Sequence, residues 1–108
     1  MHYIIMLQHI KKILEINWKK ALDNWLPVLV SEFGICDASG NGNIDEEEAD
    51  KWISILRENG IGYVCWNLSN KDESSALLKS STNNISNWED DELSQEGLWV
   101  KRTYVNNK

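Results

Sequence analysis

The residue best suited to chemistry in this chain is Glu32, which stands near the end of a short run of branched apolar side chains. The run, PVLVSEFG at residues 27–34, is bounded by proline and glycine. Such a run predicts a buried parallel strand over residues 28–33. Parallel α/β sheets and barrels keep their reactive groups at the carboxyl ends of their strands. Glu32 is therefore a candidate catalytic carboxylate, although a charged residue can also simply end a strand.

The residues after Glu32 predict a βαβ unit. Residues 36–45 are turn formers, and Asp45 is placed to cap a helix whose first turn is acidic. That helix presents one apolar face and ends at Asn59-Gly60; the face consists of Ala49, Trp52, Ile53 and Leu56. A second strand follows at residues 61–66 and ends in Trp66. Two parallel strands joined through a helix imply a right-handed crossover.

The flanking segments are less regular. Residues 4–26 show weak helical spacing, and residues 91–105 predict a last helix that carries Leu93, Leu98, Val100 and Tyr104. We assign Trp52 to the core and expect Trp88 and Trp99 to pack helices. A two-stranded parallel sheet cannot cover both of its faces, so the sequence looks like part of a larger fold.

Composition excludes several classes of function. The chain has 108 residues, of which 42% are hydrophobic and 26% charged, with a formal net charge of −6. This describes one small globular domain. An acidic chain lacks the basic face of a nucleic-acid-binding protein and the basic patch that favours membranes. No stretch reaches the ~18 apolar residues of a membrane span, and the N-terminus lacks the order of a signal peptide.

Cysteine and tryptophan usage leaves alternatives open. We interpret Cys36 and Cys65 as small buried apolar residues, while a disulfide between them stays open. The six tryptophans suit sugar-binding platforms, but tryptophan also fills cores.

A calcium-binding loop is the main alternative to catalysis. Residues 37–48 fit the twelve-position EF-hand pattern, with Asp37, Ser39 and Asn41 at positions 1, 3 and 5, Gly42 at position 6 and Glu48 at position 12. The flanks argue against this reading, because a strand rather than a helix is predicted to enter the loop and no second hand is visible. A polar loop that caps a helix has the same composition.

Read together, several segments resemble the C-terminal third of a family 5 glycoside hydrolase, a bacterial endoglucanase (cellulase). The segments are PVLVSEFG (27–34), CDASGNGNID (36–45), EADKWISIL (48–56), NGIGYVCWNLSNKDESSALLK (59–79) and NWEDDELSQEG (87–97). The resemblance implies an α/β fold, a partial (β/α)8 TIM barrel that covers about the last two β/α units. A complete barrel needs roughly 250 residues.

The resemblance also implies roles for four residues. Glu32 matches the nucleophile of a retaining endo-β-1,4-glucanase, Trp66 matches a sugar-stacking platform, and Lys71 and Glu73 match polar contacts to glucosyl hydroxyls. The plainer readings are that Trp66 is a core tryptophan and that Lys71 and Glu73 belong to a solvated charged loop. The implied partner is a β-glucan polysaccharide, with no cofactor or metal, no nucleic acid and no membrane. The parent family is extracellular.

The resemblance weakens toward the N-terminus. Residues 1–18, MHYIIMLQHIKKILEINW, stand where the family has a segment of the type YALHFYAATHK. Codons for these residues can spell a family-like peptide in the neighbouring frame. We therefore interpret residues 1–19 as a divergent segment, with out-of-frame translation as the hypothesis, and residues 20–108 as the C-terminal part of a catalytic barrel. The family's general acid, in an Asn-Glu pair, is absent from the sequence, so we expect the isolated chain to be inactive.

Overall fold

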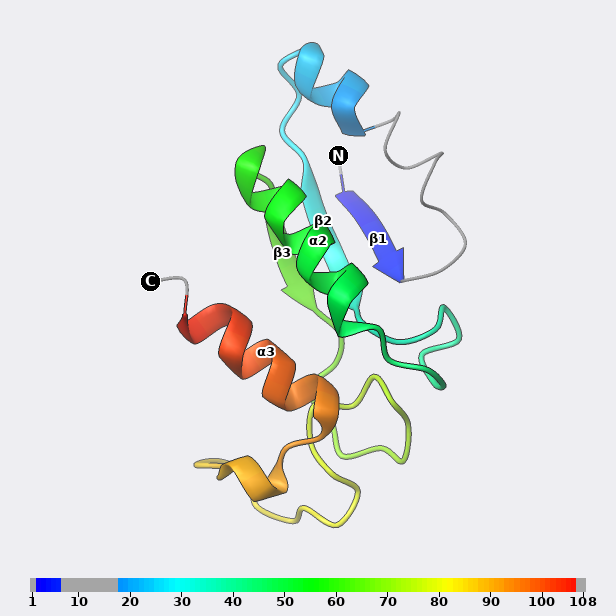
Figure 1. Ribbon diagram of the computed structural model, residues 1–108, viewed down its shortest axis with the longest axis vertical. Coiled ribbons are helices and arrows are strands. Elements are labelled where there is room, and N and C mark those ends of the chain that lie inside the picture. The colour runs from blue at the N-terminus through cyan, green and yellow to red at the C-terminus, as the bar shows by residue number, and fades with distance from the viewer. Residues whose placement is uncertain (1, 7–17, 107–108) are drawn as a thin grey trace.

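The computed structural model describes the backbone of residues 2–6 and 18–106, with side chains from residue 18 onward. Three parallel strands form one sheet in the order β1-β2-β3, and two longer helices pack beside it (Figure 1). The strands are β1 (His2–Met6), β2 (Leu29–Gly34) and β3 (Gly62–Cys65); the helices are α2 (Glu46–Glu58), α3 (Gln95–Val105) and a short 3-10 helix (Asp90–Glu92). Residues 18–23 are also helical.

Strand β2 lies at the centre of the sheet and pairs in parallel on both sides. Glu32 is opposite Ile4 of β1, and Phe33 is opposite Cys65 of β3. The register shifts on both sides of β2, between Tyr3 and Ile4 and between Val30 and Phe33. Such irregularities let a strand re-aim a side chain. The parallel pairing of β2 and β3 around α2 confirms the predicted βαβ unit.

Strand β1 corrects the helical reading that began at residue 4. Residues 2–6 form a strand beside β2 rather than a helix. Their sequence, HYIIM, contains aromatic and β-branched residues that favour strands. The remainder of that reading, over residues 7–17, lies outside the described residues, as does most of the segment assigned to residues 1–19.

Helix α2 follows the sequence prediction closely. The Asp45 carboxylate accepts a hydrogen bond from the Glu48 backbone N–H at 3.0 Å, which caps the first turn. The helix ends just before Gly60, whose φ of 64° is readily adopted only by glycine. Its buried residues are Ala49, Trp52, Ile53 and Leu56, as predicted.

Helix α3 is shorter than predicted and turned differently. Ser94 caps it by accepting a hydrogen bond from the Gly97 backbone N–H at 3.0 Å. The buried side consists of Glu96, Gly97, Trp99 and Thr103, whereas Leu98 and Tyr104 are 40% and 42% exposed. Starting the helix at Ser94 turns Trp99 inward, and the Trp99 indole N–H donates to Asp50 at 2.9 Å.

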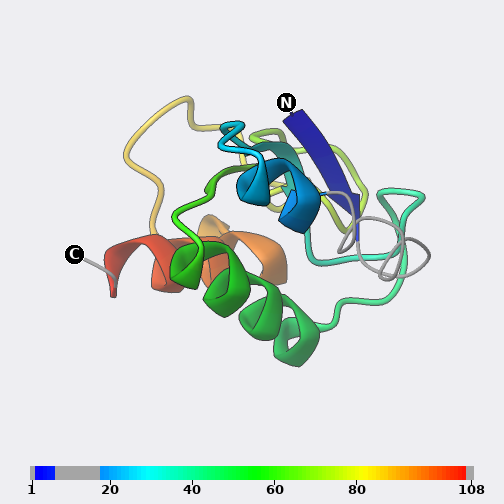
Figure 2. The same cartoon turned by 90° about the horizontal axis from the view of Figure 1, so that it is seen from above.

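The core lies between one face of the sheet and the helices, and α2 and α3 lie on the same side of the strands (Figure 2). Phe33 is fully buried there; its ring is 5.9 Å from that of Trp99 and 6.4 Å from that of Tyr63. Trp18 and Trp52 also belong to this core. Each such side chain contributes about 2 kcal/mol through burial. In the described part of the chain, no helix combines the length and hydrophobicity needed to cross a bilayer.

The two cysteines and Trp88 are shielded from solvent to different extents. Cys36 is buried and Cys65 half-buried, and both are free thiols. Burial raises the pKa of each thiol to about 11. Trp88 is half-buried, and its indole N–H donates to the Asn84 carbonyl at 2.8 Å within the loop that precedes the 3-10 helix.

Helix α3 also buries a carboxyl group. Glu96 is fully buried, and neither carboxylate oxygen has a hydrogen-bond partner within the described residues. Burial raises the pKa of Glu96 to about 8; the nearby Ile35 backbone opposes this rise but does not reach hydrogen-bonding geometry. The charged form of Glu96 is therefore disfavoured in the folded chain.

We expect Glu96 to make the free energy of unfolding depend on pH. Between its ordinary pKa of 4.5 and the folded value of about 8, the folded chain keeps a proton that the unfolded chain has lost. Stability attributable to this group therefore falls as pH rises through that window, by at most about 1.4 kcal/mol per pH unit. Urea unfolding at pH 4.5 and pH 8 should show that Glu96→Gln gains stability at pH 8 relative to the parent chain and little at pH 4.5.

The matched control is Glu58→Gln at the exposed end of α2. In this variant, the free energy of unfolding should change between pH 4.5 and pH 8 by the same amount as in the parent chain. An equal gain from Glu96→Gln at both pH values would contradict the assignment.

Gly97 offers a second test of the fold, because a Cβ at this position would lie 2.0 Å from the Leu77 carbonyl oxygen. Replacing an unhindered helical glycine by alanine usually stabilises a helix by up to about 1 kcal/mol. Here we expect the opposite sign, a loss on the order of 2 kcal/mol, because α3 must move away from backbone atoms. Urea unfolding of Gly97→Ala measures this loss in the free energy of unfolding. The control is Gln95→Ala, at an exposed position of the same helix. Unchanged or higher stability of Gly97→Ala would contradict the close approach.

Candidate active site

Strand β2 places Glu32 on the face of the sheet opposite the helices. Val30 and Phe33 both pack into the helix-side core, because the register shift between them interrupts the alternation of the strand. From Glu32 onward the pairing with β1 is regular, and successive side chains point to opposite faces. Glu32, the residue before Phe33, therefore points to the other face, where it is half-buried. It lies close to the carboxyl end of β2, which ends at Gly34.

Strand β3 brings Trp66 to the same face. Tyr63 and Cys65 contact Tyr104 of α3, with the Tyr104 hydroxyl donating to the Tyr63 carbonyl at 3.1 Å and the Cys65 thiol 3.7 Å from the Tyr104 oxygen. Val64 and Trp66, which alternate with them, are then turned away from α3. The Trp66 backbone N–H donates to the Phe33 carbonyl at 2.8 Å, which places Trp66 beside the end of β2.

We call the side of the sheet that faces away from α2 and α3 the open face and define it by Leu29, Glu32, Val64 and Trp66. The apolar members are exposed: Leu29 by 44%, Val64 by 52% and Trp66 by 44%. Leu29 reaches across to β3, where its Cδ1 would lie 3.2 Å from a Cβ at Gly62. The open face thus combines one carboxylate with an accessible indole, a pair that can bind a sugar ring by stacking and act on it through an oxygen nucleophile.

The loop after Trp66 is folded back on itself. Its first residue, Asn67, follows a cis peptide bond and donates its backbone N–H to the Ser75 carbonyl at 2.9 Å. The Asn67 carbonyl in turn accepts the Leu77 N–H at 3.1 Å. These two bonds close the segment between Asn67 and Ser75, which carries Lys71 and Glu73.

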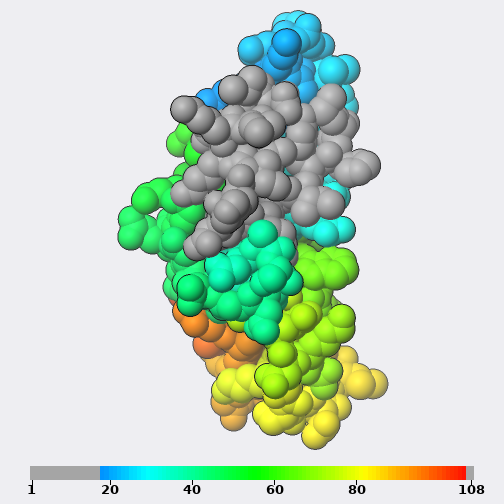
Figure 3. All heavy atoms as spheres, turned by 90° about the vertical axis from the view of Figure 1, so that its right-hand side faces the viewer, coloured from blue at the N-terminus to red at the C-terminus, as the bar shows by residue number. Residues whose placement is uncertain are grey.

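The loop between β2 and α2 supports that segment from the side. The Ser74 backbone N–H donates to the Asn41 side-chain oxygen at 3.1 Å, and the Gly42 N–H donates to the Ser74 hydroxyl at 3.0 Å. Residues 36–45 and residues 67–82 consequently lie side by side on the surface (Figure 3). Gly42 has a φ of 124°, and a Cβ there would lie 2.5 Å from the Asp37 carboxylate. Glycine is therefore required for this close turn.

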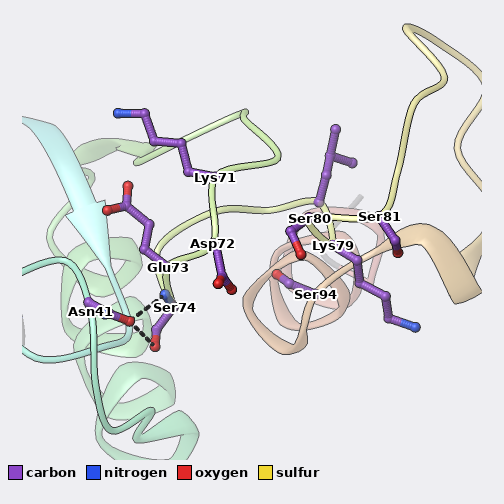
Figure 4. A pocket seen from close by; sticks show the side chains of 10 residues that line it. Asn41, Lys71, Asp72, Glu73, Ser74, Lys79, Ser80, Ser81 and Ser94 are labelled. Atoms are coloured by element: carbon purple, nitrogen blue, oxygen red, sulfur yellow. Dashed lines mark hydrogen bonds between the residues drawn. The ribbon is translucent and has the colours of Figure 1, made fainter.

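Lys71 and Glu73 line a common cavity of about 610 Å³ (Figure 4). Their side chains extend to the same side of the loop, whereas Asp72 between them points the other way. Glu73 accepts a hydrogen bond from the Ser75 hydroxyl at 3.4 Å. The volume is in the range of ligand-binding clefts. The other lining residues are Asn41, Asp72, Ser74, Leu78, Lys79, Ser80, Ser81 and Ser94.

The four predicted site residues thus fall into two groups. Glu32 and Trp66 share the open face, and Lys71 and Glu73 share the cavity, which neither Glu32 nor Trp66 lines. The chain segment from Trp66 to Lys71 connects the two groups. Sequence reasoning missed the Asn41–Ser74 contact, because nothing in either segment signals a partner 33 positions away.

The structure argues against the calcium-loop alternative. A strand, β2, enters the loop where an EF-hand has a helix. Two of the expected ligands already accept backbone hydrogen bonds: Asp37 accepts from the Asn43 N–H at 3.2 Å, and Asn41 accepts from the Ser74 N–H. Across residues 18–106, no three side chains of histidine, cysteine, aspartate or glutamate are grouped to hold a metal ion.

Comparison with known proteins identifies the family. The family model described as cellulase, glycosyl hydrolase family 5, matches residues 5–72. Endoglucanase A of Butyrivibrio fibrisolvens is 43% identical over 83 residues, which are 76% of this chain and 19% of that protein. Cellulase CelDZ1 of a Thermoanaerobacterium species is 40% identical over 89 residues, covering 79% of this chain and 23% of that protein.

Solved structures agree with the fold. A protein from Cytophaga hutchinsonii aligns with a TM-score of 0.83 and 30% identity over 99% of this chain and 35% of its own length. A GH5 cellulase from an Icelandic hot spring isolate aligns with a TM-score of 0.75 and 40% identity, over 81% of this chain and 28% of its own length. The catalytic domain of Thermobifida fusca endoglucanase Cel5A, solved in complex with cellotetraose, aligns with a TM-score of 0.68 and 25% identity, over 95% of this chain and 33% of its own length.

These matches confirm the resemblance found in the sequence and the α/β fold with parallel strands, which aligns with part of a TIM barrel. The chain spans about a fifth of the curated relatives and about a third of the solved chains. Since the family model covers more than half of the chain, the chain belongs to glycosyl hydrolase family 5, the cellulase family.

Proposed function

We propose that this chain supplies the nucleophile and part of the sugar-binding surface of a retaining endo-β-1,4-glucanase. The observation that carries the proposal is the placement of Glu32 and Trp66 at the carboxyl ends of neighbouring parallel strands, on one open face. Reactive groups of barrel enzymes lie at this end of the strands. The endoglucanase relatives support a cellulose-type substrate. The proposal also places the parent enzyme outside the cell, as the family resemblance implies.

Glu32 acts by covalent catalysis. Its ionised carboxylate attacks the anomeric carbon of the glucosyl unit while a second carboxyl group protonates the leaving oxygen, and a glycosyl-enzyme forms. Water, deprotonated by that second group, then attacks the same carbon and releases Glu32. The central strand holds Glu32 in a fixed direction, which lowers the entropic cost of reaching the attack geometry.

Trp66, Lys71 and Glu73 bind the glucan chain. The exposed indole of Trp66 offers a flat surface for the CH groups of a glucosyl ring. Lys71 donates hydrogen bonds and Glu73 accepts them, so the pair in the cavity can hold sugar hydroxyls. A relative in complex with cellotetraose supports glucan as the ligand class.

The second carboxyl group must lie about 5–5.5 Å from the nucleophile in a retaining enzyme. The sequence lacks the family's Asn-Glu pair that carries it. We therefore propose that the chain has no cellulase activity by itself and that the acid/base group is supplied by preceding β/α units.

The proposal is tested in a single-chain chimera. Residues 20–108 replace the matching segment of Butyrivibrio fibrisolvens endoglucanase A, and hydrolysis of carboxymethylcellulose is measured. We expect an active chimera whose kcat falls by more than about 10³-fold in Glu32→Gln, because the covalent step is lost. Glu58→Gln, at the exposed end of α2, serves as the matched control and should leave kcat unchanged. Retained activity in Glu32→Gln would refute the proposed nucleophile.

The same chimera tests Trp66. Removing the stacking surface with Trp66→Ala should raise KM for cello-oligosaccharides about fivefold to tenfold, since an aromatic stacking contact contributes about 1 kcal/mol. Trp66→Phe keeps an aromatic face and should recover most of the binding. Equal KM values for the alanine and phenylalanine variants would show that Trp66 does not stack on sugar.

A further inference from the structure

We propose that the loop between β2 and α2 positions the glucan-binding segment, with Asn41 and Ser74 as the positioning pair. The pair acts through Lys71 and Glu73 and raises the affinity for the glucan chain without touching the reacting atoms. The inference rests on the proposed function, because it requires that Lys71 and Glu73 bind sugar. It also gives a role to the polar motif at residues 37–48, for which the structure argues against calcium binding.

The first observation is the length of the loop. Connections between a strand and a helix in α/β units usually take about 2–6 residues. Here β2 ends at Gly34 and α2 begins only at Glu46, where the Asp45 side chain caps the helix. The additional residues extend along the surface to the segment that follows β3 (Figure 3). The loop is therefore longer than the connection and the helix cap require.

The second observation is that the base of the loop is fixed to the end of β2. The Asp45 N–H donates to the Ile35 carbonyl at 2.9 Å, and the Asp37 N–H donates to the Asn43 carbonyl at 3.1 Å. The Asp37 carboxylate accepts the Asn43 N–H at 3.2 Å. Since Ile35 directly follows β2, the loop projects as a closed turn from the strand that carries Glu32.

The third observation is that the tip of the loop is bonded to two successive serines. The Asn41 side-chain oxygen accepts the Ser74 N–H at 3.1 Å and lies 3.2 Å from the Ser74 hydroxyl (Figure 4). That hydroxyl accepts the Gly42 N–H at 3.0 Å and lies 2.7 Å from the Gly42 carbonyl, so its proton is shared between two acceptors. The Ser75 N–H donates to the Gly40 carbonyl at 3.0 Å. The loop tip thus holds the backbone of both serines.

The two serines in turn fix the direction of Glu73, which precedes them. The Ser75 side chain is fully buried; its hydroxyl donates to the Glu73 carboxylate at 3.4 Å and accepts from the Asn67 side-chain amide at 3.3 Å. The Glu73 N–H donates to the Lys71 carbonyl at 2.9 Å, so the two residues share one turn. A continuous path of hydrogen bonds therefore leads from the end of β2 to the pair that lines the cavity.

This path affects binding because Lys71 and Glu73 carry long side chains on a surface loop. A ligand that must order such groups when it binds loses affinity, and a loop that is ordered beforehand avoids this cost. Without the Asn41 side chain, the segment would still be closed at Asn67, but Ser74 would lose the acceptor that fixes its position. We therefore expect a weaker complex with glucan and an unchanged βαβ unit.

The experiment applies amide hydrogen exchange and NMR titration with cellotetraose to the full chain. In Asn41→Ala, the Ser74 N–H should exchange at least about tenfold faster, with the amides of α2 unchanged. The Kd for cellotetraose should rise about fivefold to tenfold, as expected when two side chains must be ordered on binding. Asn41→Asp keeps the acceptor oxygen and loses the amide donors, so it should retain most of the parent affinity.

The matched control is Asn43→Ala, at an exposed asparagine of the same loop. Within the described part of the chain, Asn43 contributes its backbone and not its side chain to the hydrogen bonds of the turn. This variant should keep the exchange rates and the Kd of the parent chain. Glu73→Ala, which removes a proposed sugar contact, should raise the Kd.

The results distinguish the positioning pair from the proposed function. Unchanged exchange or unchanged affinity in Asn41→Ala, with weaker binding in Glu73→Ala, would overturn the positioning pair alone. Equal losses of affinity in Asn41→Ala and Asn41→Asp would also overturn it, because the Asn41 amide would then contact the sugar itself. So would faster exchange throughout α2, which would assign Asn41 to the stability of the whole fold. A parent chain that does not bind cellotetraose, or binding that is insensitive to Glu73→Ala, would overturn the proposed sugar contacts and the positioning pair with them.

Discussion

The burial of Phe33 between the sheet and the helices is the constraint on which the site depends. Its ring stacks on Trp99 and touches Tyr63, so β2 is held with this side chain on the helix side. Side chains in a strand alternate, and a slip of one residue would exchange the two faces. The packing of Phe33 thus determines that Glu32, its neighbour, lies on the open face with Trp66.

A second constraint acts on the loops. Ser74 and Asn41 join segments that are distant in sequence, and Asn67 closes the loop that begins after β3. Together they hold Lys71 and Glu73 on one wall of a cavity instead of leaving them on a freely moving loop. The sheet therefore orients one group of site residues and the paired loops orient the other.

The sequence predicted those features that depend on neighbouring residues. Helix α2 was predicted from its Asp45 cap, its apolar spacing and its glycine stop, and β2 from its branched run. Strand β1 was missed because leucine and isoleucine at spacings of three and four outweighed the local β-branched signal. The packing of Trp99 was predicted, but the burial of the rest of the inward face of α3 was not, because the rotation of α3 depends on the Ser94 cap and on Asp50, a residue of another helix. The loop contacts were missed for the same reason, since they join residues far apart in the chain.

The position of Cys36 has a consequence for the chemical durability of the fold. The thiol is 1% exposed and keeps its proton throughout the neutral range, because burial raises its pKa to about 11. Alkylating reagents and peroxides react with the thiolate of an accessible cysteine. Modification of Cys36 must therefore wait for a transient opening of the loop that follows β2, where Cys36 is bridged to Ile44, so the labelling rate of this sulfur reports how often that loop opens.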